Sequence, residues 1–294
     1  MAAGRGCGCG GGCGGGCGGT CGATAAQQVA GRSAPVYGVG RLRGSFPSLG
    51  AEREYQALTG ADPQALVPVA DLAQLLAAPD HRHLATQMCW VFESRLGTPG
   101  FVVVPRDRED LSLLVASLQD DDVLHVVVGS PATGGSPFAC PVPTGLPAVW
   151  PEQFLSFRSD ELIEAMPAPS AAGGTTADEA AADAAAKWRQ VATTLFAWLT
   201  QRLDNAGISD QHRALNYLAV RYPAMYHLAY DQQRAGKVLI GLDARGAQGQ
   251  ERRAVVVRLT FRNPHTQVVE RYHCQVDTHD VLPFVARPFA LSYD

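Results

Sequence analysis

Residues 254–276 read AVVVRLTFRNPHTQVVERYHCQV, and this stretch establishes the class of fold. Large apolar residues occupy every second position from Val255 to Phe261, which is the period of a β-strand with one buried face. Turn formers follow at 263–266, Asn-Pro-His-Thr, and lead into a second strand-like run. The stretch therefore predicts an antiparallel hairpin, with Cys274 on the inward side as a core thiol.

Helices are predicted ahead of this hairpin. Apolar residues recur every three and four positions over 188–203, which is typical of an amphipathic helix. Gly207 ends this helix, and Asp210 is placed to cap the next one, which runs to Tyr222. Pro223 then kinks the chain or begins a further helix.

The first half of the chain mixes both patterns. Residues 101–104 and 123–128 are apolar runs of the buried-strand type, and a helix capped by Asp107 separates them, so the two strands are expected to lie parallel. Residues 80–93 have apolar residues at helical spacing and are predicted to form a helix. Residues 48–60 form another, which a serine caps. The fold class is therefore α+β (mixed α/β), with helices packed on a mixed sheet that includes the C-terminal antiparallel hairpin.

Composition narrows the class of protein. The 294 residues include 24 basic and 28 acidic ones, so the formal charge is −4 and the basic surface expected of a nucleic-acid binder is missing. No apolar run approaches the 18 to 20 or so residues of a membrane span, and there is no secretory h-region. We expect a soluble cytoplasmic protein with no nucleic-acid or membrane partner.

The first residues have a different composition from the rest. Residues 1–25 hold 12 of the 31 glycines and 5 of the 8 cysteines, and they contain almost nothing apolar to bury. We therefore expect a disordered Gly/Cys-rich tail over 1–35 and a folded domain over 36–294. Within that domain, the small and polar residues at about 167–186 predict a flexible connector.

Three readings of this tail stay open. In the first, the tail results from a translation start assigned too far upstream, since GC-rich DNA read as codons specifies mainly Gly, Ala, Arg and Cys. In the second, the tail is a site for a soft metal ion, in which cysteine thiolates coordinate zinc or copper(I). In the third, the tail is the substrate of a modifying enzyme, and its cysteine thiols attack the preceding amides to form thiazoline rings. The cysteines concerned are Cys7, Cys9, Cys13, Cys17 and Cys21.

Motifs of common enzyme classes are missing from the sequence. It contains no G-x-S-x-G elbow, no P-loop and no H-E-x-x-H, so we assign no catalytic residue and expect no enzyme activity. A zinc site assembled from Cys89, Cys140 and His212 is an alternative, although cysteine is commonly buried for packing reasons alone. No other cofactor is expected.

Six stretches of the chain form a set: 36–41 (VYGVGR), 46–50 (FPSLG), 88–91 (MCWV), 104–107 (VPRD), 204–207 (DNAG) and 212–223 (HRALNYLAVRYP). They resemble the C-terminal domain of the PatG-type cyanobactin maturation proteases, and a similar domain ends the PatA-type protease. The resemblance runs from about Val36 to Asp294, and residues 212–223 are its most specific part.

This resemblance implies a role in a cyanobactin-like pathway, where a ribosomal precursor peptide is heterocyclised at cysteine, cut and macrocyclised. The protease and macrocyclase domain has no counterpart in this sequence, so the resemblance implies a noncatalytic accessory domain. Its expected partner is a precursor peptide or a pathway enzyme, and a homodimer is a further expectation. The alternatives are a zinc-binding or cryptic enzyme, and a precursor fusion whose N-terminal Gly/Cys segment is the modified core.

Two places on the chain are predicted to carry this function. An extended peptide is expected to add a strand to the edge of the hairpin over 254–276. His212, Arg213 and Asn216 lie close together on the helix that follows Asp210, and they are the candidate functional face.

Overall fold

The computed structural model describes residues 34–60, 69–118, 122–133, 135–140, 144–168, 178–201, 205–247 and 253–292. The chain divides into Met1–Ser33 and Ala34–Asp294. The tail predicted at 1–35, with its five cysteines, therefore lies almost wholly outside the described residues, as does much of the predicted connector at 167–186. None of the helices that the structure describes is both long enough and apolar enough to cross a membrane.

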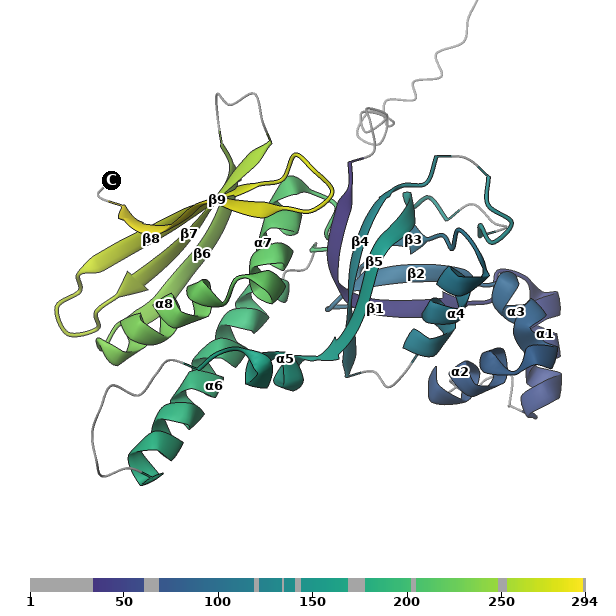
Figure 1. The fold of residues 1–294 in the computed structure, drawn as a ribbon, viewed down its shortest axis with the longest axis horizontal. Coiled ribbons are helices and arrows are strands. Elements are labelled where there is room, and N and C mark those ends of the chain that lie inside the picture. The colour runs from purple at the N-terminus through teal and green to yellow at the C-terminus, as the bar shows by residue number, and fades with distance from the viewer. Residues whose placement is uncertain are drawn as a thin grey trace, which may run out of the picture. The chain divides into compact units, whose positions relative to one another are not determined.

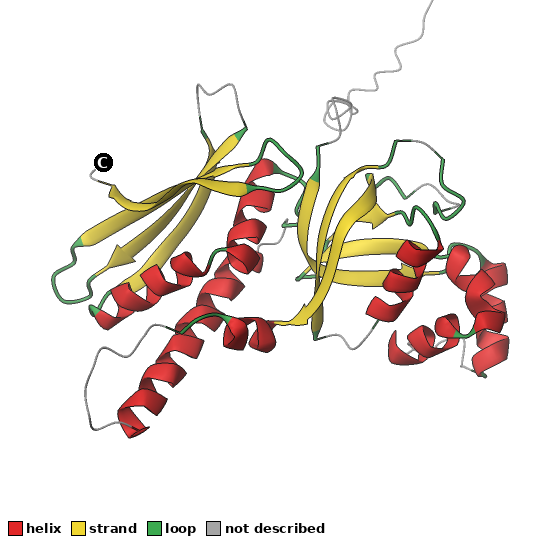
Figure 2. Cartoon of the chain, viewed as in Figure 1, coloured by secondary structure: helices red, strands yellow, loops and turns green. Residues whose placement is uncertain are grey.

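The described part of Ala34–Asp294 is an α+β fold with two sheets, which confirms the predicted class (Figures 1 and 2). Five strands close into a barrel in the order β1-β2-β3-β5-β4. All neighbouring pairs are antiparallel except β3 and β5. The barrel strands are β1 (Val36–Ser45), β2 (Cys89–Ser94), β3 (Pro99–Val103), β4 (Val123–Pro131) and β5 (Ala148–Arg158).

Two predictions about this barrel are wrong. Strands β3 and β4 do not lie side by side in parallel, because β5, which was not predicted as a strand, pairs with both of them. Residues 80–93 do not form one helix, because the helix ends at Thr86 and Cys89 begins β2. Trp90 and Phe92 are buried in the barrel core at strand spacing, and this packing outweighs the helical spacing of the local sequence.

Short helices cover the side of the barrel drawn at the right of Figure 1. The predicted helix at 48–60 is confirmed: the Ser48 hydroxyl accepts a hydrogen bond from the Ala51 amide (3.3 Å), and Gly60 ends the helix at φ 63°. Asp107 likewise caps the helix between β3 and β4. These helices are α1 (Leu49–Thr59), α2 (Val69–Ala77), the 3₁₀ turn Pro79–His81, α3 (Arg82–Thr86) and α4 (Arg108–Ser117).

The second sheet follows a group of longer helices. Its order is β6-β7-β8-β9 with every pair antiparallel, so the predicted hairpin is confirmed as β7 and β8. Cys274 is buried as predicted, and burial raises the pKa of its thiol to about 12. The elements are α5 (Ser159–Ala165), α6 (Asp178–Thr200), α7 (Asp210–Arg221), α8 (Pro223–Arg234), β6 (Val238–Gly246), β7 (Ala254–Arg262), β8 (Val269–Asp277) and β9 (Phe284–Ser292).

Strand β1 contributes to two separate hydrophobic cores. Val36 and Leu42 belong to the core that fills the barrel and reaches α1–α4. Tyr37 and Val39 point to the other face and pack with α6–α8 and the inner face of the second sheet. Because successive side chains of a strand alternate between its faces, this single strand is a wall of both cores.

Candidate functional site

Two of the three residues predicted to form a functional face are completely buried. Arg213 and Asn216 have 0% exposure on α7, whereas His212 is half-buried. The His212 backbone amide donates to the Ser209 hydroxyl (3.2 Å), so Ser209 caps α7 in place of the predicted Asp210.

Arg213 holds the segment after β8 against α7. Its guanidinium donates to the carbonyl oxygens of Thr278, Asp280 and Val281, and it also contacts the Asp210 carboxylate (3.4 Å). Burial lowers the pKa of Arg213 from its ordinary value, and Asp210 opposes that shift. The Arg213 side chain therefore connects α7 to the segment that follows β8.

Asn216 connects α7 to the barrel. Its amide nitrogen donates to the Tyr37 carbonyl of β1 (2.9 Å) and to Asn205 Oδ1 (3.0 Å), and Asn205 donates back to Asn216 Oδ1 (2.8 Å). Gly207 lies against the same strand at φ 79°, where an added Cβ would come within 2.3 Å of the Tyr37 oxygen. This close approach requires glycine. The predicted face is thus an internal junction, and neither Arg213 nor Asn216 is presented to solvent.

The predicted zinc ligands are not brought together. Cys89 and Cys140 form a disulfide, with their Cα atoms 4.7 Å apart, which fastens the loop after β4 to the start of β2. His212 lies on α7. Across the described ranges, no group of three or more His, Cys, Asp or Glu side chains is arranged to hold a metal ion.

Two surface hollows follow one another between α6 and β6. The first, of about 260 Å³, is lined by one side of α6, by α8 and by the start of β6; the second, of about 310 Å³, is lined by the last turns of α6 and by Leu242. Together they are called the α6/β6 groove. Its main lining residues are Val191, Thr194, Leu195, Trp198, Gln201, Val238, Leu239 and Leu242.

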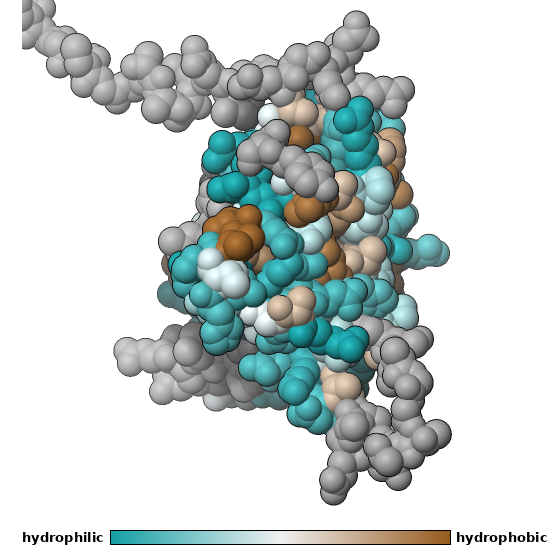
Figure 3. Space-filling model, turned by 90° about the vertical axis from the view of Figure 1, so that its left-hand side faces the viewer, coloured by the Kyte–Doolittle hydropathy of each residue, from teal (hydrophilic) through white to brown (hydrophobic). Residues whose placement is uncertain are grey.

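Large apolar side chains are exposed beside this groove. Trp198 is 41% exposed, and Val238 and Ile240 of β6 are 54% and 41% exposed. On the side of the molecule shown in Figure 3, the hydrophobic areas are separate patches within a mainly hydrophilic surface. Apolar residues next to a groove are the common pattern of a ligand or peptide site.

The start of the groove carries a charged pair. Lys237 Nζ lies 2.6 Å from Glu270 Oε1 and donates to the Gln232 side chain (2.9 Å). The hydrogen bond from Lys237 lowers the pKa of Glu270, so this carboxyl is held ionised. The pair fixes the charged end of the groove.

The edges of the second sheet differ from what the sequence predicted. Strands β7 and β8 each have a neighbour on both sides, so the hairpin over 254–276 has no free edge, and the prediction of strand addition there is wrong. Within the described chain, β6 and β9 each pair on one side only. Pro288 lies inside β9, where it removes a backbone donor and blunts that edge, whereas β6 contains no proline.

The sequence pattern does not reveal the groove, because Trp198 falls within the apolar spacing of 188–203 and so counts as part of the buried stripe of that helix. At 100° per residue, it lies about 60° round the helix axis from Leu195, at the margin of the buried face. A helical wheel centred on Leu195 and Ala192 is therefore the signal that could have placed it beside the groove.

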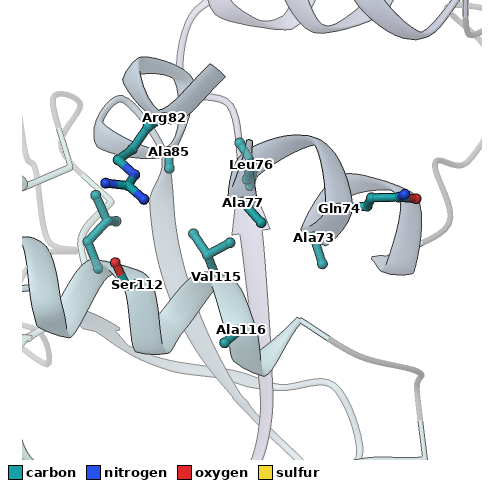
Figure 4. Close-up of a pocket in the computed structure, with 10 residues that line it drawn as sticks. Ala73, Gln74, Leu76, Ala77, Arg82, Ala85, Ser112, Val115 and Ala116 are labelled. Atoms are coloured by element: carbon teal, nitrogen blue, oxygen red, sulfur yellow. The ribbon is translucent and has the colours of Figure 1, made fainter. Parts of the chain in front are cut away.

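A third hollow, of about 390 Å³, lies between α2, α3 and α4. Figure 4 shows that small apolar side chains such as Ala73 and Val115 line it, with Arg82 and Ser112 among the few polar groups. Its described lining residues include no cysteine, histidine or carboxylate side chain.

Two comparisons with known proteins find a similarity, one to a family model and one to a solved structure. Residues 182–291 match the family model described as PatG C-terminal, which confirms the resemblance over that range. A solved structure described as "PatG Domain of Unknown Function" superposes with a TM-score of 0.62 at 19% identity, covering 88% of this chain and 99% of that one. No curated protein matches.

Proposed function

Because residues 182–291 match the PatG C-terminal family, we propose that this chain is a noncatalytic recognition domain of a PatG-type peptide pathway. It binds an extended segment of the precursor peptide, which adds as a strand to the free edge of β6. The family is known as a domain of unknown function, which is compatible with a role other than catalysis. The observation that carries the proposal is the open edge of β6 beside the α6/β6 groove.

Backbone hydrogen bonds supply the affinity in this mode of recognition. An edge strand has unpaired N–H and C=O groups on its outer side, and a second extended chain satisfies them. The edge of β6 is better suited than that of β9 because it lacks a proline. It also lies next to a helix, α6, so a bound peptide would be held between strand and helix.

Side-chain contacts supply the specificity. Alternate side chains of an added strand point to opposite faces, so every second one would enter the groove toward α6. Trp198 and Leu242 offer apolar surface there, and Thr194 and Gln201 offer polar groups. The proposed partner is therefore an extended peptide with apolar residues at alternate positions.

Replacing Trp198 with alanine is expected to weaken binding of the unmodified precursor peptide about tenfold, because the indole is a large, partly exposed apolar side chain that lines the groove. Isothermal titration calorimetry measures the dissociation constant. The matched control is Leu113→Ala, which removes another exposed apolar side chain, on α4, and should leave affinity unchanged.

Hydrogen exchange locates the bound strand. Amides of β6 should gain protection when the peptide binds, and those of β9 should not. Protection confined to β9, or no binding at high micromolar peptide, would refute the proposal.

A further inference from the structure

Three arginines converge on a polar hollow that lies apart from the α6/β6 groove. Arg41 comes from β1, Arg95 from the turn between β2 and β3, and Arg158 from the end of β5. The hollow has a volume of about 310 Å³. Its other lining residues are Asp122, Leu124, Ser159 and Asp160.

The acidic residues of this hollow are engaged with one arginine. Arg158 Nη2 lies 3.4 Å from Asp122 Oδ2, and Arg158 Nε lies 4.0 Å from Asp160 Oδ1. Among the residues that the structure describes, neither Arg41 nor Arg95 makes an ion pair with a carboxylate. Three arginines and two aspartates line the hollow, so it has a net charge of +1, and Arg41 and Arg95 are its two cations without an ion pair among the described residues.

Arg95 is held in place by uncharged groups. Its Nη1 donates to the Thr200 hydroxyl (3.3 Å), and its guanidinium lies 5.3 Å from the centre of the Phe196 ring. Burial lowers the pKa of Arg95, and the nearby charge of Arg41 lowers it further. The two cations therefore lie close enough to repel each other.

Arg41 has a buried donor without a partner. Among the described residues, none accepts a hydrogen bond from its Nε. A buried donor of this kind costs free energy unless a partner satisfies it. An anion between the two guanidinium groups would offset their mutual repulsion.

We propose that this hollow binds an oxyanion, a carboxylate or a phosphate, between Arg41 and Arg95. The planar guanidinium group offers paired N–H donors that match either anion. Thr200 and Phe196 hold Arg95 ready for the ligand, and Arg158 with its two aspartates closes the polar rim.

The test compares anions at constant ionic strength on the full chain. Thermal unfolding is followed in sodium chloride and in chloride partly replaced by sodium phosphate or by sodium succinate. Either oxyanion should raise the unfolding midpoint by several degrees as it saturates the site, because a ligand that binds only the folded state stabilises it. If only phosphate raises the midpoint, the ligand is a phosphate. If only succinate raises it, the ligand is a carboxylate.

Arg41→Gln should weaken the dissociation constant for the active anion at least tenfold, as measured by calorimetry. The matched control is Arg189→Gln, which removes the same charge from an exposed position on α6 and should bind as the unchanged protein does. In chloride, Arg41→Gln should unfold at the same temperature as the unchanged protein or higher, because it removes repulsion with Arg95 and no hydrogen bond.

Three results would overturn the proposal. The first is that neither anion shifts the midpoint. The second is that Arg41→Gln and Arg189→Gln respond alike to the anion. The third is an Arg41→Gln midpoint in chloride below that of the unchanged protein, which would mean that Arg41 has a partner in the fold.

Discussion

Arg213→Leu is expected to lower the free energy of unfolding by about 3 kcal/mol or more. The substitution leaves the buried carbonyl oxygen of Thr278 and the partly buried carbonyl oxygens of Asp280 and Val281 without their donor. It also leaves Asp210 without its buried partner. Urea unfolding followed by circular dichroism measures the change.

Arg253→Gln is the matched control for this experiment. Arg253 Nε lies 3.7 Å from the other oxygen of Asp210, but its side chain is 48% exposed, so its loss should cost less than about 1 kcal/mol. Equal losses in the two variants would show that the Asp210 ion pairs, and not the carbonyls around Arg213, determine the stability of this junction.

The second large effect is a dependence of stability on pH that originates at His125. This ring is buried in β4, contacts the Ser156 hydroxyl (3.0 Å) and stacks on Phe154, and burial lowers its pKa to about 4. In the unfolded chain the pKa returns to about 6.5, so the unfolded state takes up the proton first as pH falls. Stability is therefore full above about pH 6.5 and decreases down to about pH 4.

The expected loss from this single group is roughly 2 kcal/mol between pH 7.5 and pH 5. His125→Phe removes the titrating group and keeps an aromatic ring against Phe154. The decrease in its free energy of unfolding over that interval should therefore be smaller than that of the unchanged protein by about 2 kcal/mol. Urea unfolding at the two pH values gives both numbers. If the two proteins lose stability equally, His125 is not buried in its neutral form.

Local signals predicted the elements whose ends and buried faces are encoded nearby. Ser48 and Gly60 delimit α1, and the alternation from Val255 to Phe261 gives β7 its buried face. A helix cap depends on residues a few positions apart, and the buried face of a strand depends on the regular spacing of apolar residues. The sequence shows each of these directly.

The features that were missed depend on distant partners. The strand β5 was not predicted because Pro151 and polar residues interrupt its period, and it is a strand because both β3 and β4 pair with it. Helical spacing at 80–93 was overridden by the barrel in the same way. Cys89 and Cys140 were proposed as zinc ligands, since nothing in the sequence tells which cysteine is adjacent to which in space.

The candidate face on α7 shows a further limit of the sequence. Polar residues on one side of a helix usually mark solvent or a ligand site, but Arg213 and Asn216 instead bind backbone carbonyls of remote segments. A sequence motif can be specific to a family because it fastens the fold together. The α6/β6 groove has no such motif, because it is formed by the packing of two elements, α6 and β6, that are about 40 residues apart in the sequence.

The double role of β1 determines where this polypeptide can be divided. The family match begins at residue 182, yet the helices and the sheet in that segment pack on Tyr37 and Val39, and Asn216 bonds to the backbone of β1. A fragment cut at the family boundary would lose one wall of its core. The residues of the family match are thus not the limits of the compact unit, which runs from Ala34 to Asp294.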